Sequence, residues 1–323
     1  MTWRRVAAIS LVAAAFAVGA GLIRSTASDG APASRGAAAA ASAGRLDPAR
    51  WSDERLTIAN LGHSALLMDW FGVRAISDPT LFNRVGLSVA GLLTIGPRRH
   101  IPPPLSPAEL QNVDVILVTH AHMDHLDLPS LRALPKSAEV IACAGCGDLI
   151  RPLGFGNVRE LRWGERAEVK GLRIEAIGAR HWGVRWPPFG RAYGYNSYLL
   201  ERDGVRMLLA CDSAYTPMFA TLHSDPPDIA AFSIAAYDPW IRNHANPEQV
   251  WEMFQQSGAR YLIPLHWGTF RLSKEPMDEP MRRLLAAAKA QADRVVIRRI
   301  GVAWTLPRAV EREGWTARLA MPE

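Results

Sequence analysis

Hydrophobic and polar positions divide the chain into an apolar leader, a tract of small residues and a long body of strand-like and helix-like patterns. In the body, short apolar runs bounded by turn residues predict strands, and longer runs with apolar positions three or four residues apart predict helices. The run Val113 to Thr119 is continuously apolar apart from Asp114, which is typical of a strand buried on both faces. Strands are predicted at 56–58, 65–68, 73–76, 113–119, 138–142, 158–161, 167–177, 194–201, 205–210, 229–234, 260–265 and 294–305, and helices at 127–134, 247–257 and 276–291.

The order of these elements predicts the fold class. Two runs of strands, each followed by helices, indicate two packed sheets with helices covering both outer faces, which is an α/β fold of four layers. No composition break divides residues 46–323, so we expect them to form one domain.

The first 45 residues read as a targeting segment. A short basic start, Met1 to Arg5, precedes a run of 18 residues from Val6 to Ile23 that is uncharged and, apart from Ser10, apolar. We predict a signal peptide or N-terminal membrane anchor over 1–27 and an Ala/Ser/Gly-rich linker over 28–45. Either form would place the body outside the cytoplasm, in the periplasm or tethered to the membrane. A cytoplasmic protein with a misassigned start is the alternative.

Composition and charge narrow the class of protein. Hydrophobic residues make up 49% of the 323 residues and charged residues 21%, which excludes a disordered chain. The formal net charge is +6, but the first 45 residues hold five arginines against one aspartate. The body is therefore close to neutral, and nothing in its net charge predicts a nucleic-acid partner.

The three cysteines do not form a disulfide framework. Cys143 and Cys146 have CxxC spacing, but no second such pair completes a zinc ribbon. Small residues in a strand-to-helix turn are the favoured interpretation, and a short-range disulfide remains an alternative if the body is exported.

The strongest chemical signal directly follows the buried strand 113–119. His120, His122, Asp124 and His125 form the pattern HxHxDH. Such a concentration of imidazole and carboxylate is costly to bury without a ligand, and both groups bind zinc and similar divalent ions. A loop at the end of a strand can direct these side chains into a cleft. The sequence therefore predicts a metal site.

Further ligands must come from elsewhere in the chain. His181, Asp212 and His266 each lie just past the end of a predicted strand, as the HxHxDH loop does. This shared position favours a site at one edge of the two sheets.

These residues carry a resemblance. HxHxDH followed by His181, Asp212 and His266 resembles the metallo-β-lactamase superfamily, over approximately residues 55–305. That resemblance implies the four-layer αβ/βα sandwich known as the metallo-β-lactamase fold. A narrower similarity, to the N-acylphosphatidylethanolamine phospholipase D branch, rests on short blocks: Gly62-His63-Ser64, Ser77-Asp78-Pro79, Gly96-Pro97-Arg98-Arg99, Cys211-Asp212-Ser213-Ala214-Tyr215, Ala235-Ala236-Tyr237-Asp238-Pro239 and His266-Trp267-Gly268-Thr269-Phe270.

The resemblance implies a centre with two Zn²⁺, for which Mn²⁺ or Fe²⁺ are alternatives. One metal would be held by His120, His122 and His181, the other by Asp124, His125 and His266, and Asp212 would bridge them. A hydroxide between the metals would supply the nucleophile, oriented by Asp124 as a catalytic residue. Cys211, next to the bridging aspartate, is expected to point to the opposite face.

Other residues receive supporting roles. Asp78 and His63 are expected to hydrogen-bond metal ligands from behind, although a turn-capping role for Asp78 is equally compatible with its place before a proline. His244 matches a family position near the cleft and is expected to donate to a phosphate oxygen or to protonate a leaving alkoxide. Tyr237 and Trp267 are expected to bind substrate.

Aromatic and apolar segments near the ligands favour an amphiphilic substrate. The segment Val85 to Ile95 is apolar, punctuated by glycine and followed by Arg98 and Arg99, so it is either an exposed loop that dips into a membrane or a buried strand or helix. The aromatic residues concerned are Trp182, Trp186, Phe189, Tyr193, Tyr215, Tyr237, Trp240 and Trp267.

Three functions are compatible with these features. The first is a metal-dependent phosphodiesterase of phospholipase D type that acts on N-acylphosphatidylethanolamine-like lipids. The second is a small-molecule hydrolase with the same site, such as a lactonase resembling ascorbate-6-phosphate lactonase. The third is a binding module without catalysis, which the complete ligand set disfavours.

Overall fold

The computed structural model describes residues 45–89, 93–185 and 190–307. The predicted leader 1–27 and all but the last residue of the predicted linker lie outside the described residues. Within the described part of the chain, no helix is both long enough and apolar enough to cross a membrane.

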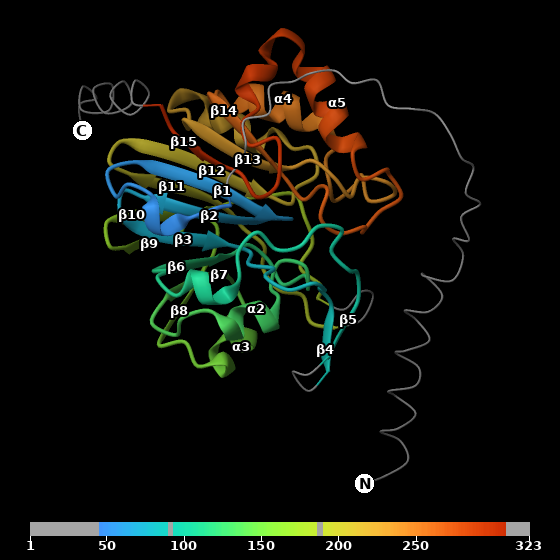
Figure 1. Cartoon of the computed structure of the whole chain (residues 1–323). Helices are drawn as coiled ribbons and strands as arrows, with labels where there is room; N and C mark the ends of the chain where they lie inside the picture. Colours follow the sequence, from blue (N-terminus) through green and yellow to red (C-terminus); the bar gives the residue numbers. More distant parts are fainter. Residues whose placement is uncertain (1–44, 90–92, 186–189, 308–323) are drawn as a thin grey trace, which may run out of the picture. The chain divides into compact units, whose positions relative to one another are not determined.

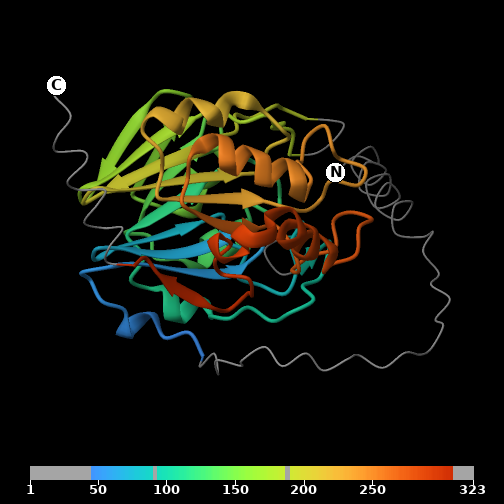
Figure 2. The same ribbon diagram turned by 90° about the horizontal axis from the view of Figure 1, so that it is seen from above.

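Two mixed β-sheets form the centre of the fold (Figures 1 and 2). The first sheet has the strand order β15-β1-β2-β3-β6-β7-β8 and the second has the order β14-β13-β12-β11-β10-β9. The strands of the first sheet are β1 (Leu56–Gly62), β2 (Ala65–Trp70), β3 (Val73–Ser77), β6 (Val115–Val118), β7 (Glu139–Cys143), β8 (Asn157–Leu161) and β15 (Ala303–Thr305). Those of the second are β9 (Arg166–Val169), β10 (Leu172–Ile177), β11 (Ser197–Arg202), β12 (Val205–Cys211), β13 (Ile229–Ser233) and β14 (Tyr261–Leu265).

Helices lie on the outer faces of both sheets (Figures 1 and 2). The α-helices are α2 (Leu128–Ala133), α3 (Gly147–Ile150), α4 (Pro247–Ser257) and α5 (Glu279–Ala288). The 3₁₀ helices are η1 (Pro48–Arg50), η2 (Pro107–Leu110), η3 (Arg151–Leu153), η4 (Pro217–Ser224) and η5 (Lys289–Arg294). Helix α4 begins at an Asn246 cap with a reciprocal Gln249 contact and ends at Gly258, in the left-handed region, so its bounds match the prediction.

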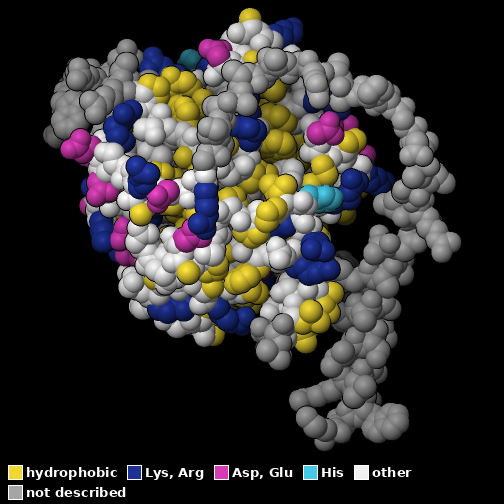
Figure 3. Space-filling view, viewed as in Figure 1, with side chains coloured by type: hydrophobic (Ala, Val, Ile, Leu, Met, Phe, Trp, Pro, Cys, Tyr) yellow, Lys and Arg dark blue, Asp and Glu magenta, His cyan; other side chains and the backbone are white. Residues whose placement is uncertain are grey.

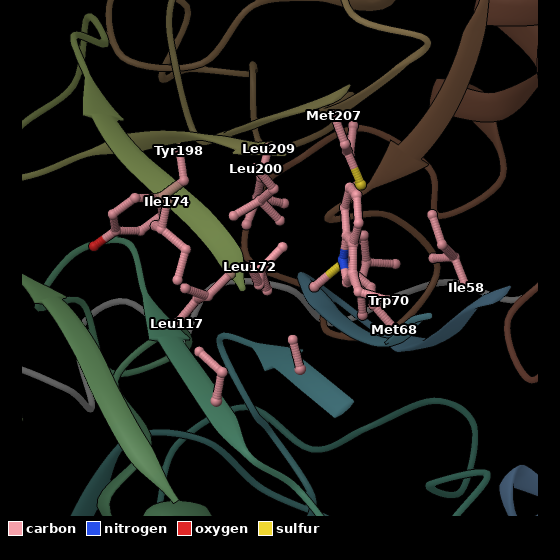
Figure 4. Packing of buried hydrophobic residues seen from close by; sticks show 14 of the residues in the cluster. Ile58, Met68, Trp70, Leu117, Leu172, Ile174, Tyr198, Leu200, Met207 and Leu209 are labelled. Carbon is pink, nitrogen blue, oxygen red and sulfur yellow. The ribbon is translucent and has the colours of Figure 1, made fainter. Parts of the chain in front are cut away.

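Successive side chains of a strand point to opposite faces of its sheet, and this alternation produces the layers of the fold. In β12, Met207 and Leu209 point between the sheets, whereas Leu208 and Ala210 face α4. Figure 4 shows part of the core between the sheets, where Trp70 lies beside Met207. Every residue of β12 is buried, and apart from Arg206 the strand is a continuous apolar run. The predicted four-layer α/β sandwich is confirmed.

Three predicted elements were wrong in detail. The single strand 167–177 is a hairpin, because Lys170 and Gly171 both adopt positive φ and reverse the chain between β9 and β10. In the predicted strand 294–305 only β15 is a strand. The predicted helix 276–291 divides into α5 and η5.

Residues 87–89 and 93–95 form a small separate ribbon. Strands β4 (Leu87–Val89) and β5 (Leu93–Ile95) pair with each other and with neither large sheet. Val85 is buried, but the other described residues of the segment 85–95 are half-buried or exposed, so the alternative of a buried strand or helix was wrong for them.

Candidate metal centre

The HxHxDH loop begins at the carboxyl end of β6, an inner strand of the first sheet. His120 pairs with Tyr195 in an isolated β-bridge, which anchors the start of the loop to the second half of the chain. The backbone N–H groups of His125 and Leu126 both donate to the carbonyl of His122, at 3.1 and 2.8 Å. The loop ends where Asp127 caps α2 by accepting from the N–H of Ser130 at 3.0 Å. The loop is therefore closed by its own backbone before any ligand binds.

The second sheet supplies the other predicted ligands. His181, Asp212 and His266 follow β10, β12 and β14, whose carboxyl ends meet at the same edge as that of β6. The Oδ2 atom of Asp212 lies 3.0 Å from His125 Nε2 and 3.2 Å from His266 Nε2. It also lies within 4.0 Å of a ring nitrogen of His120, His181 and His244.

The structure thus brings all seven predicted ligands together, and they fall into two groups. His120, His122 and His181 form one group, in which the ligand atoms lie within 4.8 Å of one another. Asp124, His125 and His266 form the other, joined by His63. Asp212 reaches both groups, which is the arrangement expected of a bridging carboxylate.

The charge state of the centre attracts cations. Burial lowers the pKa of His120, and lowers that of His122 to about 3, so both rings are neutral donors at pH 7. Burial also acts to lower the pKa of His266, but the carboxylates of Asp212 and Asp124 raise it to about 9. Burial acts to raise the pKa of Asp212, but His125 and the other histidines hold it well below its ordinary value. The carboxylates of Asp124 and Asp212 thus remain anionic in a buried site, and they raise the pKa of His125 and His266, whose protons balance that charge when no metal is bound.

The donor set fits divalent metal ions. Among the described residues, the buried His122 Nε2 and His244 Nδ1 atoms have no hydrogen-bond partner. His125 Nε2 and His266 Nε2 lie near Asp212 without hydrogen-bond geometry. Unpaired, converging imidazole nitrogens are costly to bury unless a cation accepts their lone pairs. Imidazole and carboxylate ligands suit Zn²⁺, Mn²⁺ and Fe²⁺.

Asp78 supports the centre from behind. Its Oδ2 atom accepts from His125 Nδ1 at 2.8 Å and from the Thr119 hydroxyl at 2.6 Å, and its Oδ1 atom accepts from the Thr119 N–H at 2.8 Å. The contact with His125 fixes that ring with Nε2 toward the centre. The alternative prediction, that Asp78 only caps a turn before Pro79, does not account for its contact with the His125 ring.

His63 occupies a corresponding place beside Asp124. Its Nε2 lies 2.9 Å from Asp124 Oδ2, and its ring centroid is 3.9 Å from that of His266. The backbone N–H of His63 donates to the Thr269 hydroxyl at 2.7 Å, and its carbonyl accepts from the N–H of His266 at 2.9 Å. His63 and His266 are therefore held as one unit.

The expectation for Cys211 was wrong. Its Sγ atom does not point away from the centre but donates to Asp78 Oδ2 at 3.0 Å. The cause is a shift of register between Leu209 and Cys211, together with a positive φ at Cys211, which breaks the alternation of the strand. Burial raises the pKa of Cys211 to about 12, so without a bound metal the residue is a thiol that donates to Asp78.

A pocket of about 170 Å³ opens at the centre. Trp182, Trp240 and Leu272 form its apolar side, and the other lining residues are His122, Asp124, Asp212, Ala236, His244 and His266. Neither Tyr237 nor Trp267 lines it. The Tyr237 hydroxyl instead donates to Glu279 at 2.8 Å, and Trp267 borders a separate, smaller pocket. Trp186 and Phe189 lie outside the described residues.

Replacing Asp78 with asparagine is expected to weaken metal binding by about 10–100-fold, because the amide no longer holds the His125 ring as a charged acceptor. Competition with a chelator of known affinity, followed by measurement of bound metal, checks this. Asp148→Asn, at the surface carboxylate on α3, is the matched control and should leave the affinity unchanged. Equal affinities for the two variants would contradict the assigned role of Asp78.

Comparison with known proteins agrees with this geometry. Residues 86–267, more than half of the chain, match a family described as beta-lactamase superfamily domain. An uncharacterized protein of Mycobacterium tuberculosis is 33% identical over 252 residues, which cover 75% of this chain and 66% of that protein. The chain thus spans slightly less than two thirds of that relative.

Two further similarities extend the comparison. N-acyl-phosphatidylethanolamine-hydrolyzing phospholipase D 1 of Caenorhabditis elegans is 28% identical over 261 residues, which cover 75% of this chain and 72% of that enzyme. The crystal structure of a possible metal-dependent hydrolase from Veillonella parvula matches with a TM-score of 0.63 at 18% identity, covering 78% of this chain and all of that one. The second likeness supports the fold alone.

Proposed function

The chain belongs to the beta-lactamase superfamily and is a metal-dependent hydrolase, and from this premise we propose that it is a phosphodiesterase of phospholipase D type acting on N-acylphosphatidylethanolamine-like lipids. The observation that carries the proposal is a pocket with two unlike sides, one of metal ligands and one of tryptophan and leucine. The similarity to the nematode phospholipase supports the same substrate class.

The unlike sides fit the two parts of such a lipid. The side formed by Asp124, Asp212 and the histidines suits a phosphodiester once cations are bound, and about 170 Å³ has room for little more than the head group. The rings of Trp182 and Trp240 stack at 6.4 Å with an interplanar angle of 27°. Because Trp240 is 46% exposed, this apolar wall continues to the surface, where acyl chains can lie along it.

The residues of the chain divide the catalytic work. The seven ligands fit two divalent ions, which we propose to be zinc; when bound, they would supply Lewis acidity and an activated water at neutral pH. Asp124, which His63 orients, would position that water. His244 lines the pocket with an imidazole that can donate a hydrogen bond to a phosphate oxygen or to the leaving group.

We also propose that the ribbon β4–β5 contacts an anionic lipid surface. In its pairing, Leu87 and Ile95 are opposite each other, as are Val89 and Leu93, so one face of the ribbon is apolar. Figure 3 shows hydrophobic side chains gathered over this ribbon. Arg84 and Arg98 are exposed at its base, and no acidic residue occurs between Asp78 and Glu109. The proposed export signal or anchor over 1–27 would bring the body to a membrane.

Replacing Leu93 and Ile95 together with serine is expected to lower binding to vesicles containing anionic lipid by about tenfold or more, because these side chains are 59% and 46% exposed. Vesicle sedimentation checks this. Thr94→Ser, on the opposite face of the same strand, is the control. Undiminished binding of the double variant would contradict the proposed contact.

A hydrolysis panel tests the function. The purified full chain, with its metal content measured, is assayed on N-acylphosphatidylethanolamine in mixed micelles, on bis-p-nitrophenyl phosphate and on simple lactones. Metal-dependent release of N-acylethanolamine is the expected result. Turnover of lactones with an inert phospholipid would replace the proposal with the lactonase alternative.

A further inference from the structure

Arg185 occupies a place that none of the sequence motifs indicates. It lies four residues after His181, on the segment that joins β10 to β11 of the second sheet. A single guanidinium nitrogen, Nη1, donates to the carbonyl of Ala121 at 2.6 Å and to the carbonyl of Leu126 at 3.0 Å. These two carbonyls bracket the stretch of the loop that carries His122, Asp124 and His125.

We propose that Arg185 is a positioning residue that fastens the His181 segment to the HxHxDH loop and thereby fixes the geometry of the metal centre. The inference rests on the proposed binding of metal ions, but not on the identity of the substrate. Arg185 does not contact the pocket, so it acts through the loop.

The guanidinium of Arg185 has these two carbonyls as its hydrogen-bond acceptors. No ion pair involving Arg185 occurs among the residues that the structure describes, so its charge is directed to the two carbonyls. Hydrogen bonds from a charged donor are stronger than those between neutral groups, and partial burial strengthens them further. A surface arginine would lose little by swinging into solvent, whereas this one would leave two carbonyls of the loop without that donor.

The surrounding backbone keeps the segment in place. The N–H of Tyr193 donates to the carbonyl of Gly183 at 2.8 Å, and Val184 pairs with Ala192 in a β-bridge. A Cβ atom on Gly183 would lie 1.8 Å from the carbonyl oxygen of Tyr193, so only glycine permits this approach. Arg185 is thus projected from a braced backbone, which is what a fixed distance between two segments requires.

The consequence for the first metal group is direct. His120 and His122 come from the loop, whereas His181 comes from the Arg185 segment, so that group spans both sides of the contact. Within it, His181 Nε2 lies 3.3 Å from His122 Nδ1. Removal of the guanidinium would leave the two segments joined mainly near His120, through its bridge to Tyr195, and would loosen the stretch that carries His122. Assembling these ligands around one ion would then cost more.

The test uses Arg185→Met and Arg185→Lys in the full chain, with Arg180→Met as the matched control. Arg180 lies on the same segment but is exposed and donates to Tyr215 instead. Chelator competition with Zn²⁺ is expected to show a 10–100-fold weaker affinity in the methionine variant and a smaller loss in the lysine variant, whose ammonium can replace Nη1 in part. The control should match the unchanged chain.

Two further measurements separate positioning from folding. The thermal midpoint of each metal-free variant shows whether the chain remains folded, and added guanidinium ion is expected to restore metal affinity to Arg185→Ala. A lower thermal midpoint with unaltered metal affinity would overturn the proposal, as would equal affinities for Arg185→Met and Arg180→Met. Failure of the phospholipase assay would leave this result standing, because bound metal is measured without substrate.

Discussion

Asp212→Asn is expected to lower hydrolysis of the best substrate in the panel by at least about 10³-fold. The amide has nearly the same size but cannot carry the negative charge that the two proposed cations would share, and each ~1.4 kcal/mol of lost charge stabilisation costs a factor of ten in rate. The loss should be large because Asp212 Oδ2 lies within 4.0 Å of five histidine rings, those of His120, His125, His181, His244 and His266. Steady-state rates, with bound metal measured on the same sample, check this.

The matched control is Asp203→Asn, in the exposed turn between β11 and β12 of the same sheet. It should retain both rate and metal content. An Asp212→Asn variant that loses less than tenfold in rate would show that the carboxylate does not bridge the centre. The Ser233 hydroxyl, which donates to Asp212 Oδ1 at 2.5 Å, would remain available to hold the asparagine in place.

Trp70→Ala is expected to lower the free energy of unfolding by about 3–5 kcal/mol, the usual cost of removing a large aromatic side chain from a core. Trp70 is fully buried between the two sheets, beside Ile58, Met68 and Met207 (Figure 4). Urea unfolding followed by circular dichroism, in excess chelator so that metal binding does not contribute, measures the change.

Trp163→Ala is the control for this substitution, because Trp163 is 49% exposed and its indole N–H donates to the Tyr195 carbonyl. About 1 kcal/mol is expected there, for one lost hydrogen bond at the surface. Similar losses for the two tryptophans would indicate that the packing between the sheets contributes less than the burial of Trp70 implies.

The sequence allowed the layers of the fold to be predicted, because both sheets contain strands buried on two faces. Strand β6 is apolar throughout and β12 is apolar from Met207 to Cys211, and Asn246 and Gly258 mark the ends of α4. The hairpin between β9 and β10 was not predicted. Its turn uses Lys170 at positive φ, and lysine carries no turn signal, so only the following glycine indicated a reversal.

The candidate site was predictable where ligands follow strand ends. His181, Asp212 and His266 were selected by that position, and the structure brings them to the HxHxDH loop. The direction of Cys211 could not be predicted, since a bulge leaves no trace in the pattern of apolar residues. Arg185 could not be predicted either, because its partners are backbone carbonyls, which every residue has. Leu272 was missed because nothing distinguishes a pocket leucine from one in the core.

The division of the ligands between the sheets has a consequence for how the centre comes into being. His120, His122, Asp124 and His125 belong to the loop after β6, whereas His181, Asp212 and His266 follow strands of the second sheet. Before the two sheets pack together, neither of them carries the complete set of seven ligands. We therefore expect high-affinity metal binding only late in folding, after the two sheets have packed against each other. A bound ion would then link residues of the two sheets. At a free concentration 1,000 times its dissociation constant, it would add about 4 kcal/mol to the stability of the docked state.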